Sequence, residues 1–311
     1  MNQYIHNRYL ERRVLSVFSV LFLLLANAPA QANDVQDSFS SPEKAVDSLL
    51  FATRNNHTTE LLKILGPGSD KLVYSGDDVA DQTAREKFAA AYDKMHKIED
   101  ASEGRFVLTV GDENWPMPIP LVHGKDGWRF DTKAGETEIL DRRIGRNELS
   151  VIEVCRAYVE AQRDFVADNP QHEYAQNFQS SDDKHDGLYW SAKEGEKESP
   201  LGPLIAQATA EGYSETTTLD KRVPYHGYYY KILKQQGSHA ASGAKDYMAK
   251  NQMTAGFALI AFPATYGDSG VMSFIVNQNG IVYEKNLGPQ TSDIAARITA
   301  YDPDESWHIV R

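Results

Sequence analysis

The segment Gly267-Asp268-Ser269-Gly270 matches the peptide that surrounds a catalytic serine in some hydrolases. Serine catalysis also needs a histidine base and a buried carboxylate that orients the histidine. No histidine of this chain lies in a matching motif, and Val271 and Met272 follow the segment in place of further glycine. We therefore predict a turn between two strands at this position.

Metal-binding patterns are present only in fragments. The run from Asp182 to Gly187 has the texture of a calcium loop, but Lys184 and Lys193 occupy positions that need oxygen ligands. We expect a polar surface loop there. The histidines of residues 33–311 that lie outside this loop and outside residues 235–245 form none of the spacings typical of zinc sites. They are His57, His96, His123, His172, His226 and His308. The sequence predicts no metal and no cofactor.

One basic cluster is a candidate binding surface. Arg142, Arg143 and Arg146 stand together in a chain whose formal charge is -12. Guanidinium groups bind carboxylates and phosphates through paired hydrogen bonds, so the cluster could hold an anionic ligand or partner. Salt bridges between two domains are the alternative interpretation.

A second candidate surface is aromatic. His226, Tyr228 and Tyr230 lie close together in sequence and could line a face that binds a sugar or a peptide, because tyrosine combines contact area with a polar tip. The alternative is a sheet core in which the hydroxyl groups reach the edge.

The N-terminus indicates export. Arg12 and Arg13 precede the apolar run Val14–Leu25, and A-x-A sites end at Ala30 and Ala32. This is the pattern of a secretory signal peptide over residues 1–32, with the mature chain starting at Gln31 or Asn33. The apolar run is shorter than the roughly 20 residues that span a bilayer. We therefore expect a periplasmic or secreted protein without a membrane anchor after cleavage.

Charge and cysteine content exclude some classes. Residues 1–32 contain three arginines and one glutamate, so their removal takes the charge from -12 to -14. An acidic chain without a basic stripe disfavours nucleic acid and anionic lipid as partners. The only cysteine, Cys155, excludes an internal disulfide and an acylated cysteine at the cleavage site. Its apolar surroundings predict a buried, inert thiol.

The first half of the mature chain has the pattern of helices followed by a sheet. After a flexible lead-in over 33–40, Ser41 and Pro42 are typical of a helix start. Further helices are expected over 59–65 and 81–95. Strands follow at 105–110, 115–121 and 128–131. Prolines at every second position of 115–121 favour an edge strand.

The second half begins with a long helix. We expect a short helix over 134–140, a break at Gly145, and a helix whose apolar stripe runs from Leu149 to Val166. A turn-rich stretch, a short helix over 204–211, a strand over 223–233 and a mobile loop over 235–245 follow. Three strands over 256–262, 271–276 and 281–284 then form, and Asn279-Gly280 is typical of a type I′ hairpin turn. A short helix is expected over 291–299.

Together these patterns predict the α+β class with two domains, 41–145 and 146–311, each with helices packed on a small antiparallel sheet. The first resembles the cystatin-like cone of nuclear-transport-factor-2-like domains in the order of its elements. The second is similar in order and texture to the globular head of type IV pilins and pseudopilins, without the apolar first half of the pilin helix.

A closer resemblance covers nearly the whole mature chain. It rests on the segments 142–148, 155–158, 186–190, 199–203, 226–230, 256–263, 266–272 and 280–283. These resemble a bacterial family of secreted proteins, domain of unknown function 2950. The resemblance implies export and a shared fold, and it implies no activity. We therefore expect a non-enzymatic binding or assembly module of the cell envelope with an envelope protein as partner. The alternative is an envelope hydrolase whose site is assembled around His226.

Overall fold

The computed structural model describes residues 35–102, 104–182, 184–214 and 223–310. The predicted signal peptide (1–32) and both cleavage sites lie outside these residues. Four helices open the described chain: α1 (Pro42–Arg54), α2 (Thr58–Leu65), α3 (Asp70–Val73) and α4 (Asp78–Lys94). The predicted start of α1 is confirmed, because the Ser41 hydroxyl accepts the Lys44 N–H at 3.3 Å. Helix α4 begins before the predicted Asp81, with Asp77 as its N-cap.

The residues before α1 are attached to the fold. The side-chain amide of Gln36 donates to the carbonyl oxygens of Ile64, Leu65 and Phe130 at 2.8–3.0 Å. Phe39 exchanges two backbone hydrogen bonds with Trp128. The lead-in that we expected to be flexible over 33–40 is therefore tied to α2 and to the first sheet from Gln36 onward.

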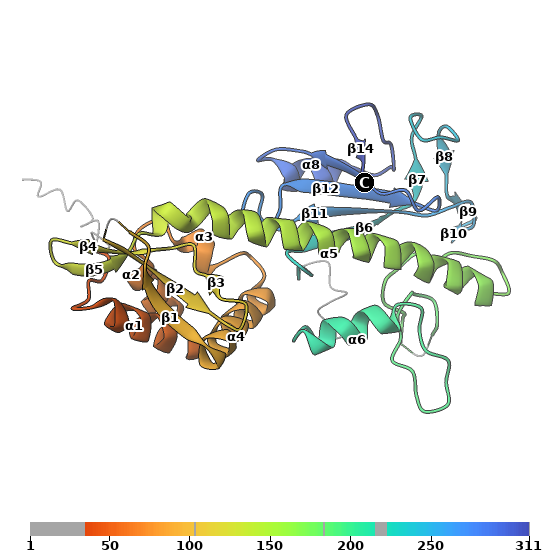
Figure 1. Ribbon diagram of the computed structural model, residues 1–311. Coiled ribbons are helices and arrows are strands. Elements are labelled where there is room, and N and C mark those ends of the chain that lie inside the picture. The colour runs from red at the N-terminus through yellow and green to blue at the C-terminus, as the bar shows by residue number, and fades with distance from the viewer. Residues whose placement is uncertain (1–34, 103, 183, 215–222, 311) are drawn as a thin grey trace, which may run out of the picture. The chain divides into compact units, whose positions relative to one another are not determined.

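The first sheet is antiparallel. Its strands are β1 (His96–Asp100), β2 (Arg105–Val110), β3 (Trp115–Pro116), β4 (Leu121–Gly124) and β5 (Gly127–Phe130). The order is β1-β2-β4-β5, and β3 pairs with the far end of β2 (Figure 1). The edge strand predicted over 115–121 is wrong over 117–120, and the chain returns to the sheet at Leu121, the first residue of β4. Met117 donates to the Leu108 carbonyl oxygen of β2 at 2.8 Å, and Pro118 passes closely over Gly135.

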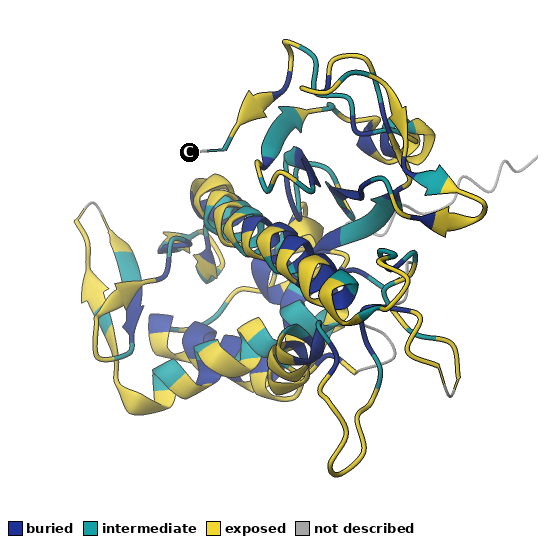
Figure 2. Cartoon of the chain, turned by 90° about the vertical axis from the view of Figure 1, so that its right-hand side faces the viewer, coloured by how far each residue is buried: buried dark blue, intermediate teal, exposed yellow. Residues whose placement is uncertain are grey.

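Helix α5 (Thr132–Asp168) is continuous over 37 residues. The break predicted at Gly145 is wrong, because one glycine costs a helix only about 1 kcal/mol and long-range packing holds both flanks. The end of the helix before Pro170 is confirmed. Buried and exposed positions alternate along α5 as two faces (Figure 2). Leu149, which we placed on the buried stripe, is 67% exposed.

The second sheet is also antiparallel and contains β6 (Tyr228–Leu233), β11 (Ala258–Pro263), β12 (Met272–Asn277), β13 (Tyr283–Asn286) and β14 (His308–Ile309). The order is β14-β13-β12-β11-β6. Helix α5 packs on β11 and β12, and α8 (Thr291–Arg297) packs on β11 (Figure 1). The last three predicted strands correspond to β11, β12 and β13, and the final predicted helix corresponds to α8, each within a few residues of its expected range.

Three local predictions for this half need correction. The strand expected over 223–233 begins only at Tyr228, because His226 and Gly227 both have positive φ and form a tight turn. The loop expected over 235–245 contains β7 (Gln235–Gln236), which pairs with β8 (Lys245–Asp246). Gly280 alone of the Asn279-Gly280 pair has a positive φ, and its N–H bonds the Asn277 carbonyl oxygen, so the turn is not type I′.

The remaining elements come between α5 and β11 along the chain. They are α6 (Gly202–Ala210), which the sequence predicted as a helix ending before Gly212, and the hairpin of β9 (Met248–Ala249) and β10 (Gln252–Met253). Among residues 170–201, of which Asp183 is not described, the structure contains no helix, as expected of a turn-rich stretch.

The protein is thus α+β, as predicted. Buried apolar side chains form one core between α1, α2 and the first sheet and another between α5 and the second sheet. Residues 34–311 make one compact unit. The division into domains 41–145 and 146–311 remains a prediction, and α5 contributes to both cores across that boundary. Within the described residues, no helix has both the length and the hydropathy that crossing a membrane requires.

Candidate functional site

A mainly apolar pocket lies between α1, α2, α4, β3 and the first turns of α5. Its volume is about 270 Å³. The apolar wall consists of Leu49, Leu61, Leu65, Leu72, Val73, Ala84, Phe88, Trp115, Met117 and Ile139. We call this cavity the arginine pocket, because Arg85, Arg142 and Arg146 complete its lining with Asp81 and Thr53. Apolar walls with a few converging polar groups are typical of sites that bind small ligands.

The side chain of Arg142 lines the pocket. Its Nε donates to Glu138, one helical turn earlier, at 2.6 Å, and its guanidinium lies 5.3 Å from the ring centre of Trp115. The Nη1 atom is buried and has no hydrogen-bond partner among the described residues. A buried N–H group without a partner costs about 1–3 kcal/mol, and a charged donor costs more.

Arg85 is a second arginine of the lining. Its Nη1 donates to the Val73 carbonyl oxygen at 3.2 Å, whereas its buried Nε has no hydrogen-bond partner among the described residues. Arg146 lines the same pocket, and desolvation, with the neighbouring charge of Arg142, lowers the pKa of its guanidinium. Sequence reasoning missed Arg85, because nothing in its local pattern places it beside residues 142–146.

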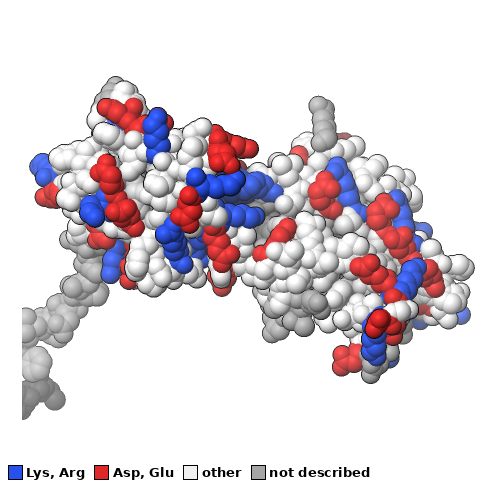
Figure 3. Space-filling model, turned by 60° about the horizontal axis from the view of Figure 1, so that its bottom comes forward, with Lys and Arg blue, Asp and Glu red and all other residues white. Residues whose placement is uncertain are grey.

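Asp81 is the one acidic group in the pocket lining. It is 7% exposed and accepts the Ser75 N–H at 2.8 Å. Burial raises the pKa of this carboxyl, while the Ser75 hydrogen bonds and the charges of Arg143 and Arg85 oppose that rise. The pocket thus has more cationic than anionic groups within an acidic protein. On the face drawn in Figure 3, Lys and Arg lie interspersed with Asp and Glu.

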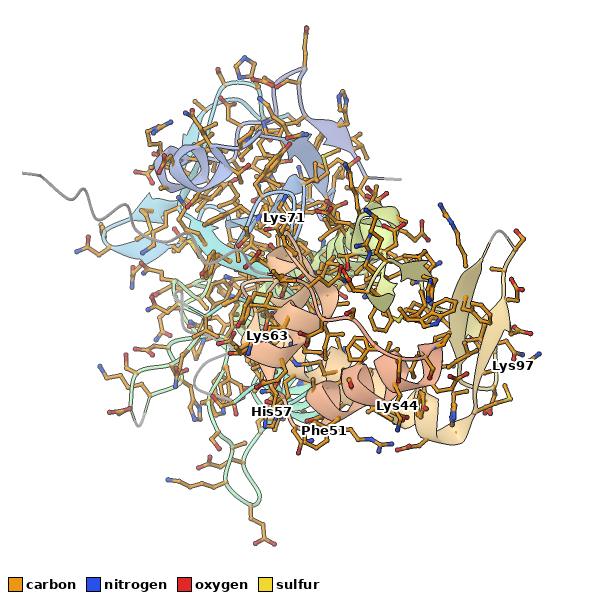
Figure 4. The ribbon with its side chains drawn as sticks, turned by 90° about the vertical axis from the view of Figure 1, so that its left-hand side faces the viewer. Lys44, Phe51, His57, Lys63, Lys71 and Lys97 are labelled. Carbon is orange, nitrogen blue, oxygen red and sulfur yellow. The ribbon has the colours of Figure 1, made fainter. Side chains whose placement is uncertain are left out.

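Arg143 has a structural environment. Its two Nη atoms donate to the carbonyl oxygens of Lys71 and Leu72 in α3, at 2.6 and 2.9 Å. Lys71, labelled in Figure 4, also pairs with Asp268 at 3.9 Å. The three predicted arginines therefore divide into two groups: Arg142 and Arg146 line the pocket, and Arg143 fastens α3 to α5.

Asp77 is a buried carboxylate that joins the first helices to the turn before β6. It is 2% exposed. Its Oδ1 accepts the Ala80 N–H at 3.0 Å and caps α4, while its Oδ2 accepts the Tyr213 hydroxyl at 2.8 Å and the Gly227 N–H at 2.9 Å. We call Asp77, Tyr213 and Gly227 the Asp77 cluster. It was missed from the sequence, because its partners lie more than 130 residues away.

His226 lies next to this cluster. Its Nε2 is 3.3 Å from Glu211 Oε2, and its ring packs beside that of Tyr225 with 4.1 Å between centroids. Within the described residues, no Ser, Thr or Cys side chain is hydrogen bonded to the His226 ring. Among the described residues, the geometry therefore pairs a histidine with a carboxylate and places no hydroxyl or thiol in a hydrogen bond with the imidazole.

His226 makes the stability of the protein depend on pH. Burial lowers the pKa of its imidazole, Glu211 and Asp77 oppose this effect, and Lys87 adds to it. As pH falls below about 6.5, the unfolded chain binds a proton that the folded chain does not bind, so stability is lost. We expect His226→Asn, which tolerates the positive φ of this position, to lose less Tm than the wild type between pH 7.5 and 5.5.

Thermal unfolding at several pH values measures this effect. His239→Asn is a control of opposite sign, because its hydrogen bond with Asp302 raises the pKa of His239 and its charged form favours the folded state. Parallel Tm curves for His226→Asn and the wild type would contradict the prediction.

Tyr228 and Tyr230 do not form an exposed face with His226. Tyr228 is fully buried, and its hydroxyl donates to the Met272 carbonyl oxygen at 2.9 Å. Tyr230 is half-buried and donates to the Tyr225 carbonyl oxygen at 3.2 Å. Tyr228 therefore belongs to the sheet core, the alternative that the sequence left open.

The segment Gly267-Asp268-Ser269-Gly270 is a turn between β11 and β12, as predicted. Ser269 is fully buried, and its hydroxyl bonds both the N–H and the carbonyl oxygen of Thr265. Asn147 and Glu148 of α5 hold this turn through backbone groups of Ser269, Val271 and Met272. Ser269 therefore has a structural role in this turn.

Two further chemistries have little support in the described residues. No group of three or more His, Cys, Asp or Glu side chains there could hold a metal ion. Cys155 is buried, and burial raises the pKa of its thiol to about 12. The thiol therefore stays protonated near neutral pH and is unsuited to nucleophilic chemistry.

The fold and the pocket define an α+β protein with a mainly apolar cavity of about 270 Å³ that is lined in part by arginine side chains. A family model described as "Protein of unknown function (DUF2950)" matches residues 36–310. The chain therefore belongs to the DUF2950 family, as its sequence segments indicated. No curated protein and no solved structure matches the chain. The pilin-like and cystatin-like resemblances consequently have no solved structure in their support.

Proposed function

We propose that this chain is an exported, non-enzymatic binding or assembly protein of the bacterial cell envelope and that the arginine pocket is its binding site. The observation that carries the proposal is that three guanidinium side chains, those of Arg85, Arg142 and Arg146, line one mainly apolar cavity.

The lining favours binding over catalysis. The described residues of the lining include no His, Cys or Ser, and the one hydroxyl among them is that of Thr53. Nucleophilic catalysis needs a nucleophile together with a base within hydrogen-bond reach. Arginine donors around an apolar space suit recognition of a group that has both a negative charge and an apolar portion. The acidic remainder of the chain opposes nonspecific attachment to polyanions.

The test is capture of what the protein binds in its own compartment. The tagged full chain is crosslinked in cells, purified, and examined by mass spectrometry for a protein partner and, without crosslinking, for a retained small molecule. We expect one dominant species that is lost in Arg142→Ala and kept in Arg156→Ala. Arg156 is a matched control on the same helix, exposed and paired with Glu153 three residues earlier.

Two results would overturn the proposal. One is a bound species that Arg142→Ala and a pocket-filling Ala84→Phe variant retain at wild-type level while both variants stay folded. The other is the absence of any species enriched over an unrelated exported protein.

A further inference from the structure

The charges that line the arginine pocket define a chemical class of ligand. We propose that the pocket binds a phosphate monoester with a short apolar substituent, with the substituent among the apolar side chains and the phosphate beside the arginines. This inference rests on the proposed function and goes beyond it by naming what is bound.

Positive charge exceeds negative charge in the lining. Among its described residues, Arg85, Arg142 and Arg146 are the cations and Asp81 is the one anion. Opposite charges attract more strongly beside apolar walls than in bulk water. A phosphate monoester has a charge of about −1.5 to −2 near pH 7, whereas a carboxylate or a sulfate monoester has a single negative charge. The dianion therefore matches the excess positive charge better than a monoanion does.

The charges just outside the lining do not remove this excess. Glu138 accepts a hydrogen bond from Arg142 Nε at 2.6 Å, and Arg143 adds a positive charge to the same region. Asp268, whose charge acts on Arg143, pairs with Lys71 at 3.9 Å. Each neighbouring negative charge is thus accompanied by a positive one.

Arg146 is the least compensated of the three arginines. Its side chain is exposed, and no hydrogen bond or ion pair joins it to another described residue. Arg142 lies one helical turn before it on the same face of α5. Desolvation and the charge of Arg142 both lower the pKa of Arg146. A dianion between the two guanidinium groups would replace their repulsion with two attractions.

Contacts within the lining hold the other two guanidinium groups at the cavity wall. The Arg142 guanidinium lies 5.3 Å from the ring centre of Trp115, and Arg85 Nη1 donates to the Val73 carbonyl oxygen at 3.2 Å. Trp115 and Val73 both line the cavity. Cations from α4 and α5 are therefore placed at one cavity before a ligand arrives, and groups fixed in advance lose little side-chain entropy on binding.

The rest of the lining favours a short apolar substituent. Leucine, valine, isoleucine, phenylalanine, tryptophan and methionine side chains supply most of it. The cavity volume of about 270 Å³ lies just below the range of roughly 300–1,000 Å³ that is typical of small-molecule sites. A chain of about six carbons suits this size, whereas a sugar phosphate would place hydroxyl groups against walls that offer few hydrogen-bond partners.

Isothermal titration of the full mature chain with hexyl phosphate is the direct test. Hexyl sulfate keeps the shape with one negative charge, hexanol has no charge, and inorganic phosphate lacks the chain. We expect hexyl phosphate to bind at least tenfold more tightly than hexyl sulfate or hexanol. Burial of each methylene raises affinity about fourfold, so inorganic phosphate should bind on the order of 100-fold more weakly or worse.

Variants assign the binding to the pocket. Arg146→Gln should weaken hexyl phosphate at least tenfold and leave hexanol unchanged. Without ligand, its Tm should equal or exceed that of the wild type, because the substitution removes the repulsion with Arg142. Ala84→Phe should weaken both compounds by filling the cavity. Arg156→Gln, exposed on the same helix and paired with Glu153 in the wild type, should bind hexyl phosphate normally. Circular dichroism establishes that each variant is folded.

A lipid could present the same head group, and vesicles distinguish this source from a soluble ester. Vesicles that contain phosphatidic acid are sedimented with the protein and compared with vesicles of neutral lipid. We expect the protein to remain in solution with both, because the cavity has room for one short chain only.

The proposal is wrong if hexyl sulfate or hexanol binds as tightly as hexyl phosphate, if Arg146→Gln leaves the affinity unchanged, if phosphatidic acid vesicles sediment the protein, or if hexyl phosphate does not bind. The proposed function fails separately, through the capture experiment. If cells yield a species whose retention requires Arg142 and an open pocket while hexyl phosphate does not bind, the ligand class is wrong and the binding function stands.

Discussion

Replacing Asp77 by alanine should destabilise the protein by about 3–5 kcal/mol, because it leaves the Tyr213 hydroxyl and the Gly227 N–H buried without an acceptor and removes the cap of α4. Loss of a typical N-cap costs about 1 kcal/mol, and hydrogen bonds to a buried charged group contribute about 1.5–3 kcal/mol each before non-additivity. Equilibrium unfolding in urea measures the difference.

Two matched variants separate these contributions. Asp78→Ala removes an exposed carboxylate from the first turn of α4 and should cost less than about 1 kcal/mol, mostly through the helix dipole. Asp77→Asn retains an oxygen that can cap α4 but places an amide where two donors converge, so it should lose more than half of the Asp77→Ala effect. A loss near 1 kcal/mol in Asp77→Ala would mean that only the cap matters.

The hydrogen bonds of Asp77 connect two distant parts of the fold. Oδ2 fixes the turn at Gly227, and the neighbouring His226 N–H bonds the Tyr213 hydroxyl at 3.3 Å. On the other side, the Ser75 hydroxyl accepts the Asp77 N–H, and the Ser75 N–H bonds Asp81 of the arginine pocket. One short segment, 75–81, thus connects the pocket lining with the turn that precedes β6.

Local signals explain which parts of the fold could be predicted. Ser41-Pro42 specifies a helix start through capping and a fixed φ, and both effects act within four residues. The strand at 105–110 and the last three strands are rich in residues that favour strands, and turns separate them. An acidic pair at Asp77-Asp78 is itself a capping signal, so the true start of α4 was open to sequence analysis.

Long-range contacts explain the rest. The arginine pocket combines residues from Leu49 to Arg146, and no sequence period relates Arg85 to Arg142. The sequence predicted that His226-Gly227 is part of a strand, because histidine at positive φ is uncommon. The turn is held here by the Asp77 cluster. The arginine cluster is visible from the closeness of the three residues in sequence. Only the structure separates Arg143, which has a structural role, from Arg142 and Arg146.

Two glycines of α5 should respond in opposite ways to the same substitution. Alanine favours a helix over glycine by about 0.5–1 kcal/mol. A Cβ at Gly145 would meet no heavy atom within 4 Å, so Gly145→Ala should stabilise the protein by about that amount. A Cβ at Gly135 would lie 2.5 Å from the Pro118 carbonyl oxygen and 2.7 Å from the Ile119 nitrogen. Gly135→Ala should therefore destabilise by about 1–3 kcal/mol, as overpacking does.

Urea unfolding of both variants tests whether α5 is continuous. If the helix were broken at Gly145, alanine there would remove a flexible joint and lower stability, whereas a continuous helix gains propensity. Gly135→Ala reports on the proline segment after β3, because the clash involves backbone atoms that cannot move aside as a side chain can. If Gly135→Ala left the free energy of unfolding unchanged, this segment would not approach α5 closely. Met117, which lines the arginine pocket, would then lack support from its neighbours.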